Sequence, residues 1–204
     1  MAIFLDGIIR HTAVIPFGGN IITKDIKTGL SILEKQAELL KVKFGSAMHT
    51  SDQDNVMVSI PGLRGREPKE ISIKNLAEII SARMKEIIDL VYHEIKVSGF
   101  ENKLMTGIVL TGGGSQLRAL PQLVSYITGK DVRVGLPNEH LGKESHGKVT
   151  SPMYSTGVGL VLKGFEDLEA HLVGKDKEDD KPTPGGILVR LKELLAEFFE
   201  EDVT

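Results

Sequence analysis

The chain has 204 residues, of which 41% are hydrophobic and 26% charged, so it can build the packed core of one large domain or two small ones. A formal net charge of -3 argues against a general nucleic-acid binder, since such proteins are usually basic. The absence of cysteine excludes disulfides, thiolate chemistry and cysteine-based zinc sites. We expect neither a signal peptide nor a membrane-spanning helix, which needs roughly 18 consecutive apolar residues.

The chain is predicted to open with a β-hairpin. Asp6-Gly7 is a strong two-residue turn signal between the apolar runs at 3–5 and 8–16. Two further short strands are expected over 56–60 and 70–73, because proline and glycine turns surround both segments.

Helices are predicted wherever apolar residues recur every three to four positions. One is expected to begin near Thr23 or Asp25, and a second covers 34–44 and ends at Gly45. The longest covers about 74–98, where a continuous apolar stripe marks one face.

Strands and helices are also predicted in the second half of the chain. Strands are predicted over 107–110 and 132–134, with a helix over 116–128 between them. A polar loop follows over 137–148, and another helix over 154–165.

Three consecutive glycines, Gly112 to Gly114, separate the strand at 107–110 from the next helix. Glycine permits positive φ and close approach of a ligand to the backbone, and a helix start attracts anions, so this turn is a candidate nucleotide site. Ser115 is predicted to cap the following helix with its side chain. Neither a Walker loop nor a dinucleotide fingerprint fits the residue spacing, and a plain strand-to-helix turn is the structural alternative.

The C-terminal part begins with a charged, proline-containing segment over 175–184, which is typical of a solvated linker. After Gly185-Gly186 an amphipathic helix is predicted. Such a helix either docks on protein or lies on a membrane surface. Large apolar residues share one of its faces: Ile187, Leu188, Leu191, Leu194, Leu195, Phe198 and Phe199.

Several charged residues are candidates for binding. Glu38 and Lys41 are one helical turn apart and can point the same way, although a solvated pair is the ordinary explanation. Lys74, Arg83 and Lys85 lie on the predicted long helix, where a solvated face is the default. The six histidines show no metal-ligand spacing, and no catalytic Ser-His-Asp set is apparent, so we assign no metal site and no catalytic residue.

Four segments together resemble the FtsA family of bacterial cell-division proteins, which are membrane-tethered homologues of actin. HTAVIPFGGN at 11–20 resembles the signature after that family's second phosphate loop, and AELLKVKFG at 37–45 resembles its nucleotide-side helix. IVLTGGGSQL at 108–117 looks like the adenosine motif of the actin superfamily. YSTGVGL at 154–160 resembles the closing helix of the same lobe, and the order and spacing of the four match the family.

The resemblance implies the second lobe of an actin-like, ribonuclease H-like α/β fold, with a central sheet and an inserted α/β subdomain. Residues 1–31 would begin subdomain 2A, 32–98 would form subdomain 2B and 99–170 would complete 2A. A disordered linker at 171–186 and a membrane-targeting helix at 187–204 would follow. The first lobe and both phosphate loops precede this region in the family, so the chain resembles the C-terminal half.

The resemblance also implies nucleotide-binding residues. Glu38 would accept hydrogen bonds from the ribose hydroxyls, and Lys41 would lie along the adenosine. Gly112, Gly113 and Gly114 would admit the adenine and α-phosphate to the backbone, beside Ser115. The intact family would bind ATP with Mg²⁺ and show at most weak ATPase activity, and this chain alone is expected to be inactive.

The partners implied are the C-terminal peptide of the tubulin homologue FtsZ, other divisome proteins, further copies of the chain, and the cytoplasmic face of the inner membrane at the division site. Arg83 falls where the family carries an arginine that contacts FtsZ, with Lys74 and Lys85 nearby. The membrane contact would use Leu191, Leu194, Leu195, Phe198 and Phe199.

Two other functions remain open at this point. A lobe of a sugar or acetate kinase would share the superfamily fold, but gives no reason for a linker and amphipathic tail. A protein-binding module with a decayed nucleotide site would keep the peptide dock alone.

Overall fold

The computed structural model describes residues 1–49, 55–62, 67–138, 141, 147 and 149–175. The chain divides into two compact units, residues 1–159 and 160–204, of which the second is described as far as Lys175. Within the described part, no helix is both long enough and apolar enough to cross a membrane. The proposed linker and C-terminal helix lie outside the described residues, except for residues up to 175.

The chain opens with the predicted hairpin. β1 (Ala2–Leu5) pairs antiparallel with β2 (Ile8–Thr12), which ends earlier than expected. Asp6 and Gly7 have φ of 54° and 75°, the left-handed pair that a tight hairpin turn requires.

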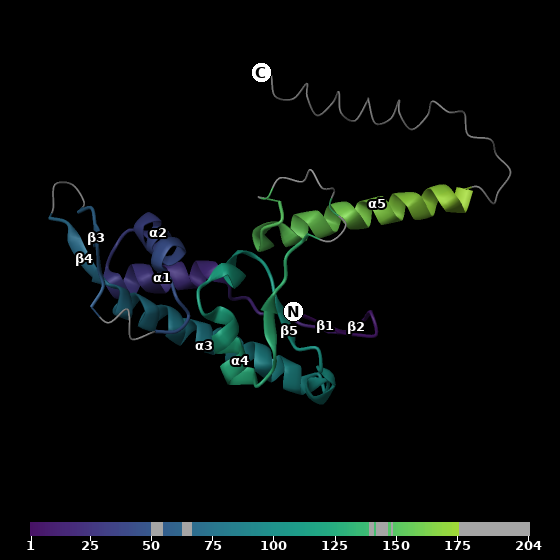
Figure 1. The fold of residues 1–204 in the computed structure, drawn as a ribbon, viewed down its shortest axis with the longest axis horizontal. Helices are drawn as coiled ribbons and strands as arrows, with labels where there is room; N and C mark the ends of the chain where they lie inside the picture. Colours follow the sequence, from purple (N-terminus) through teal and green to yellow (C-terminus); the bar gives the residue numbers. More distant parts are fainter. Residues whose placement is uncertain (50–54, 63–66, 139–140, 142–146, 148, 176–204) are drawn as a thin grey trace, which may run out of the picture. The chain divides into compact units, whose positions relative to one another are not determined.

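The core of the first unit is built by α1 (Gly19–Leu30), α2 (Glu34–Phe44) and α3 (Ile73–Val97), and α1 packs against both other helices (Figure 1). The bounds of α2 and α3 confirm the predicted helices. α1 begins before the predicted start because the Gly18 carbonyl already accepts a hydrogen bond from the Ile21 amide, which closes the first turn. Apolar side chains buried between these helices include Ile22, Ile26, Leu40, Leu76 and Ile80.

A second hairpin leads into α3. β3 (Met57–Ile60) pairs antiparallel with β4 (Lys69–Ser72), whose last residue caps α3 by accepting a hydrogen bond from the Asn75 amide. Both strands match the predicted segments to within a residue. Ile60 and Ile71 are buried in the core that the helices form.

The glycine turn belongs to a parallel β-α-β unit. β5 (Ile108–Leu110) pairs in parallel with β6 (Val132–Val134), and α4 (Leu120–Thr128) connects them and packs on α3 and β6. A short 3₁₀ turn, η2 (Glu101–Lys103), precedes β5. After the loop come the 3₁₀ turn η4 (Pro152–Tyr154) and α5 (Ser155–Lys175), which is longer than predicted.

The strands that the structure describes form no continuous sheet across the predicted subdomains. Instead there are three separate two-stranded sheets, β1–β2, β3–β4 and β5–β6. A sheet continues only where a strand offers hydrogen bonds to both neighbours, and no described strand joins β1–β2 to β5–β6. Phe4, Ile8 and Ile9 of the first hairpin are more than half exposed.

Candidate functional site

In the glycine turn after β5, the backbone conformation requires glycine at one position and not at the other two. Gly112 has a φ of +84°, and its amide donates to the Pro152 carbonyl at 3.0 Å. Gly113 and Gly114 are exposed in the 3₁₀ turn η3 (Gly113–Gln116) and have ordinary φ values. Among the described residues, a Cβ at Gly114 would meet nothing within 4 Å, and one at Gly113 only Met153 Cγ at 3.4 Å. The space above these two residues therefore leaves their backbone open to a ligand.

Ser115 does not cap the following helix. Its hydroxyl donates to the Gly112 carbonyl at 2.7 Å, and the side chain is buried inside the turn. α4 starts only at Leu120, after Ala119 in a left-handed conformation, and no side chain caps its first turn. The prediction was wrong because the 3₁₀ turn separates the serine from the helix, so Ser115 holds the shape of the glycine turn instead.

On α2, Glu38 and Lys41 form the pair that their spacing predicted. Lys41 Nζ lies 2.7 Å from Glu38 Oε2, and it also donates to Thr23 Oγ1 at 2.9 Å and the Gly19 carbonyl at 3.0 Å. An ammonium has three N–H donors, so these contacts use all of them. Only 14% of the Lys41 side chain is exposed. The ammonium of Lys41 is therefore fully engaged by acceptors of the protein itself.

The Glu38 carboxylate has one engaged and one available oxygen. Thr23 Oγ1 donates to Oε2 at 2.5 Å, and Lys41 contacts the same atom. Among the described residues no donor reaches Oε1, and 48% of the side chain is exposed. Oε1 is thus the acceptor that this helix face offers to a hydroxyl donor.

The pKa of Glu38 is shifted below its ordinary value. Partial burial raises the pKa, but the hydrogen bonds from Lys41 and Thr23 and the positive charge of Lys41 outweigh it. The carboxylate is therefore charged at neutral pH and is held in that state by its partners.

The end of α2 is seated against the residues that follow the glycine turn. The Ala47 amide donates to the Arg118 carbonyl at 2.8 Å, and Ser46 and Arg118 form a parallel bridge. Gly45 has no room for a side chain, since a Cβ there would lie 2.3 Å from the Lys41 carbonyl and 3.0 Å from Leu117 Cδ1. Glycine is therefore needed at this position for space and not for its backbone conformation. Its backbone is extended (φ -64°), unlike the left-handed C′ glycine that often ends a helix.

The structure does not bring Lys74, Arg83 and Lys85 onto one face of α3. Arg83 turns toward α1, where its guanidinium holds Asp25 by two bonds, Nε–Oδ2 at 2.5 Å and Nη2–Oδ1 at 3.1 Å. The hydrogen bonds to Asp25 are the largest cause of a rise in the pKa of Arg83 above its already high ordinary value. Lys74 and Lys85 are eleven residues apart, close to three helical turns, and so share another face.

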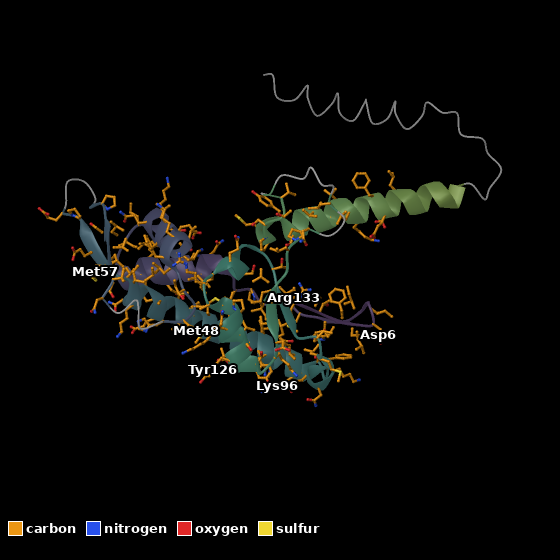
Figure 2. All side chains as sticks on the ribbon, in the orientation of Figure 1. Asp6, Met48, Met57, Lys96, Tyr126 and Arg133 are labelled. Carbon is orange, nitrogen blue, oxygen red and sulfur yellow. The ribbon has the colours of Figure 1, made fainter. Side chains whose placement is uncertain are left out.

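Lys85 lies at the edge of a groove between α3 and α4, whose volume is about 380 Å³. Met48 and Tyr126, both labelled in Figure 2, line the same groove with Ala82. Tyr126 is 80% exposed, so its ring stands at the rim. The groove and the Arg83 guanidinium are thus two distinct surfaces of the same helix.

Sequence reasoning did not assign Thr23, Asp25 or the Gly19 carbonyl to a site. Thr23 lies 15 residues from Glu38 and Asp25 lies 58 residues from Arg83, so no local period links them. No cluster of three or more His, Asp or Glu able to hold a metal occurs in the part of the chain that the structure describes.

A family model described as "Cell division protein FtsA" matches residues 1–159, more than half of the chain. The chain belongs to the FtsA family. Among curated proteins, FtsA of Neisseria meningitidis serogroup B is 36% identical over 98% of this chain and 48% of its own length. FtsA of Escherichia coli K12 is 33% identical, also over 98% of this chain and 48% of its own length. FtsA of Pseudomonas aeruginosa is 35% identical over 94% of this chain and 46% of its own length. The chain therefore spans about half the length of these FtsA proteins.

Solved structures show that the fold is actin-like. The crystal structure of Spiroplasma citri MreB5 bound to AMPPNP matches with a TM-score of 0.61 and 19% identity, over 83% of this chain and 51% of that one. The ADP-bound crystal structure of the same protein matches with a TM-score of 0.54 and 23% identity, over 65% and 44%. The predicted family and fold class are both confirmed.

Replacement of Glu38 by glutamine should change the pH dependence of stability. A carboxylate whose folded pKa is lowered stabilises the fold above its unfolded pKa, and this contribution is lost as the pH falls through the folded pKa. Thermal melts should therefore show a gap between the wild type and Glu38→Gln at pH 7 that closes below about pH 4. Glu34→Gln on the same helix removes an exposed pair with Lys27 and serves as the control. A gap that stays constant down to pH 3 would contradict this assignment.

Proposed function

We propose that this chain is the nucleotide- and partner-binding half of a cell-division scaffold, which binds ATP in an actin-like cleft and links FtsZ filaments to the inner membrane. The observation that carries the proposal is the FtsA family match over residues 1–159. The scaffold acts with other divisome proteins and further copies of itself on the cytoplasmic side of the division site. ATP serves as a conformational ligand, and no residue of this chain is given a catalytic role.

The nucleotide proposal rests on Glu38, Lys41 and the glycine turn. Glu38 Oε1, which no donor reaches among the described residues, would accept from ribose hydroxyls, and Lys41 would lie along the adenosine. The exposed backbone at Gly113 and Gly114 has room for a close approach, while Gly112 and Ser115 shape the turn. Mg²⁺ would accompany the ATP phosphates. The MreB5 structures were obtained with ADP and AMPPNP, which supports the choice of an adenine nucleotide.

The peptide proposal rests on Arg83, whose planar guanidinium suits carboxylates of an acidic segment. We propose that the FtsZ C-terminal peptide engages this side chain. Lys74 and Lys85, on another face of α3, would bind a second part of the partner near the groove. This division of the three cations follows from their positions on the helix.

The membrane proposal concerns residues outside the described part of the chain. Leu191, Leu194, Leu195, Phe198 and Phe199 would insert into the lipid surface from an amphipathic helix. Two basic and five acidic residues between 190 and 202 give this helix a net charge of -3. Since attraction to anionic lipid supplies about 1 kcal/mol per basic residue near the surface, binding must depend on apolar insertion and on several copies acting together.

We expect ATP binding when this chain is joined to the first lobe of Neisseria meningitidis FtsA. Isothermal titration calorimetry with ATP and Mg²⁺ should detect binding, and Glu38→Ala should weaken it roughly tenfold because a charged acceptor for the ribose is lost. Glu34→Ala, an exposed acid of the same helix, should leave binding unchanged. No binding by a folded joined protein would favour a protein-binding module with a decayed nucleotide site.

We expect a fluorescent FtsZ C-terminal peptide to bind this chain in anisotropy titrations. Arg83→Glu should abolish saturable binding, because it replaces the attractive guanidinium by a repelling carboxylate. Lys85→Glu makes the same charge change on the groove side and should weaken binding less. Unchanged binding by Arg83→Glu would show that the peptide does not use this arginine.

Liposome flotation tests the tail. The chain should float weakly with vesicles of inner-membrane lipid, and Leu195→Glu or Phe198→Glu should prevent this by placing a charge on the inserting face. Glu197→Gln, on the polar face, should float at least as well as the wild type. Flotation that survives both apolar-to-acidic substitutions would rule out the anchor.

A further inference from the structure

The Arg83 guanidinium is shared by two acidic side chains of the protein itself. Asp25 of α1 holds the edge formed by Nε and Nη2, at 2.5 and 3.1 Å. Glu86, one turn further along α3, accepts from Nη1 at 2.5 Å. These bonds use three of the five N–H donors, and the two that remain are one on Nη1 and one on Nη2. An external carboxylate on the edge formed by Nη1 and Nη2 would therefore share Nη1 with Glu86.

The two internal partners differ in exposure and in geometry. Asp25 and Arg83 are each 27% exposed, and their two parallel bonds make a fork contact between different helices. Glu86 is 64% exposed and makes a single contact from the same helix, at i+3. Exposed pairs of this kind contribute little, because water and salt screen them and a long side chain must be ordered. Glu86 is consequently the partner that an incoming carboxylate displaces more easily.

We propose that Glu86 is an internal competitor that occupies the outward edge of Arg83 until an acidic peptide replaces it, while Asp25 keeps the guanidinium in place. This inference rests on the proposed docking of an acidic peptide at Arg83. The incoming carboxylate takes the edge formed by Nη1 and Nη2, and Glu86 turns into solvent. Asp25 is a positioning residue, since it acts on the peptide only through Arg83.

Two consequences distinguish this arrangement from simple charge attraction. Removing the Glu86 charge should strengthen binding, because the peptide carboxylate no longer meets a second carboxylate at the same nitrogen. Removing the Asp25 charge should weaken it, although both changes make the protein less acidic by the same amount. General electrostatic attraction predicts tighter binding in both cases.

The test is a set of anisotropy titrations with the labelled FtsZ peptide and the full chain, in low and physiological salt. Glu86→Gln should bind roughly two- to fivefold more tightly than the wild type, the size of effect expected for an exposed ion pair. Asp89→Asn makes the same charge change at an exposed position on α3 and serves as the control. Its change in log Kd should be less than half of the change that Glu86→Gln produces. Asp25→Asn should bind more weakly, and Asp25→Glu should restore part of the loss.

Each outcome decides the matter, provided that circular dichroism shows folded variants. If the wild type binds the peptide and Glu86→Gln has the same affinity as Asp89→Asn, Glu86 is not a competitor, although the docking function stands. If Asp25→Asn gains more affinity than Glu86→Gln, the roles of the two acids are reversed and the inference is wrong. If no variant binds the peptide, the docking function itself fails. An affinity gain confined to Glu86→Gln supports the inference, since a merely damaged fold does not bind more tightly.

Discussion

The arrangement of the nucleotide-side residues depends on the ammonium group of Lys41. Two of its hydrogen bonds, to Thr23 Oγ1 and the Gly19 carbonyl, join α2 to the first turns of α1, and its third contact holds Glu38 of the same helix. The group is largely shielded from water, so these bonds are less screened than those of a surface pair. Because the ammonium fixes Glu38 Oε2, it also fixes the direction in which Oε1 faces.

α1 supports both candidate sites. Thr23 reaches the Lys41 cluster on α2, and Asp25, two residues later, reaches Arg83 on α3. Residues two apart on a helix point about 200° away from each other, which is why one helix can serve both neighbours. A rotation or shift of α1 would therefore change the geometry of the Glu38 carboxylate and of the Arg83 guanidinium together.

The sequence predicts those parts of the fold that have local signals. Asp6-Gly7 identifies the first hairpin, and the apolar stripe identifies α3 because both depend only on neighbouring residues. The spacing of Glu38 and Lys41 likewise predicts their ion pair. Ser115 was assigned to the wrong role, because nothing local indicates that a 3₁₀ turn intervenes before α4.

Contacts between distant segments could not be predicted in the same way. The bond from Lys41 to Thr23 spans 18 residues and that from Arg83 to Asp25 spans 58, and each requires the packed helices to exist first. The family resemblance places residues in a known fold, but it does not say which atoms are already engaged by neighbours. Only the structure shows that the Lys41 donors are fully used and that Arg83 has two acidic partners.

The contact between Asp25 and Arg83 also constrains how this sequence can diverge. Each side chain is only partly accessible, so loss of Arg83 leaves the Asp25 charge facing α3 without its counter-charge, whereas loss of Asp25 leaves Arg83 with Glu86 alone. A substitution at one of these positions is therefore expected to change which side chains the other position tolerates. A sequence that exchanged the acid and the base between α1 and α3 would keep an ion pair between the two helices while reversing the charge that each helix carries at this point.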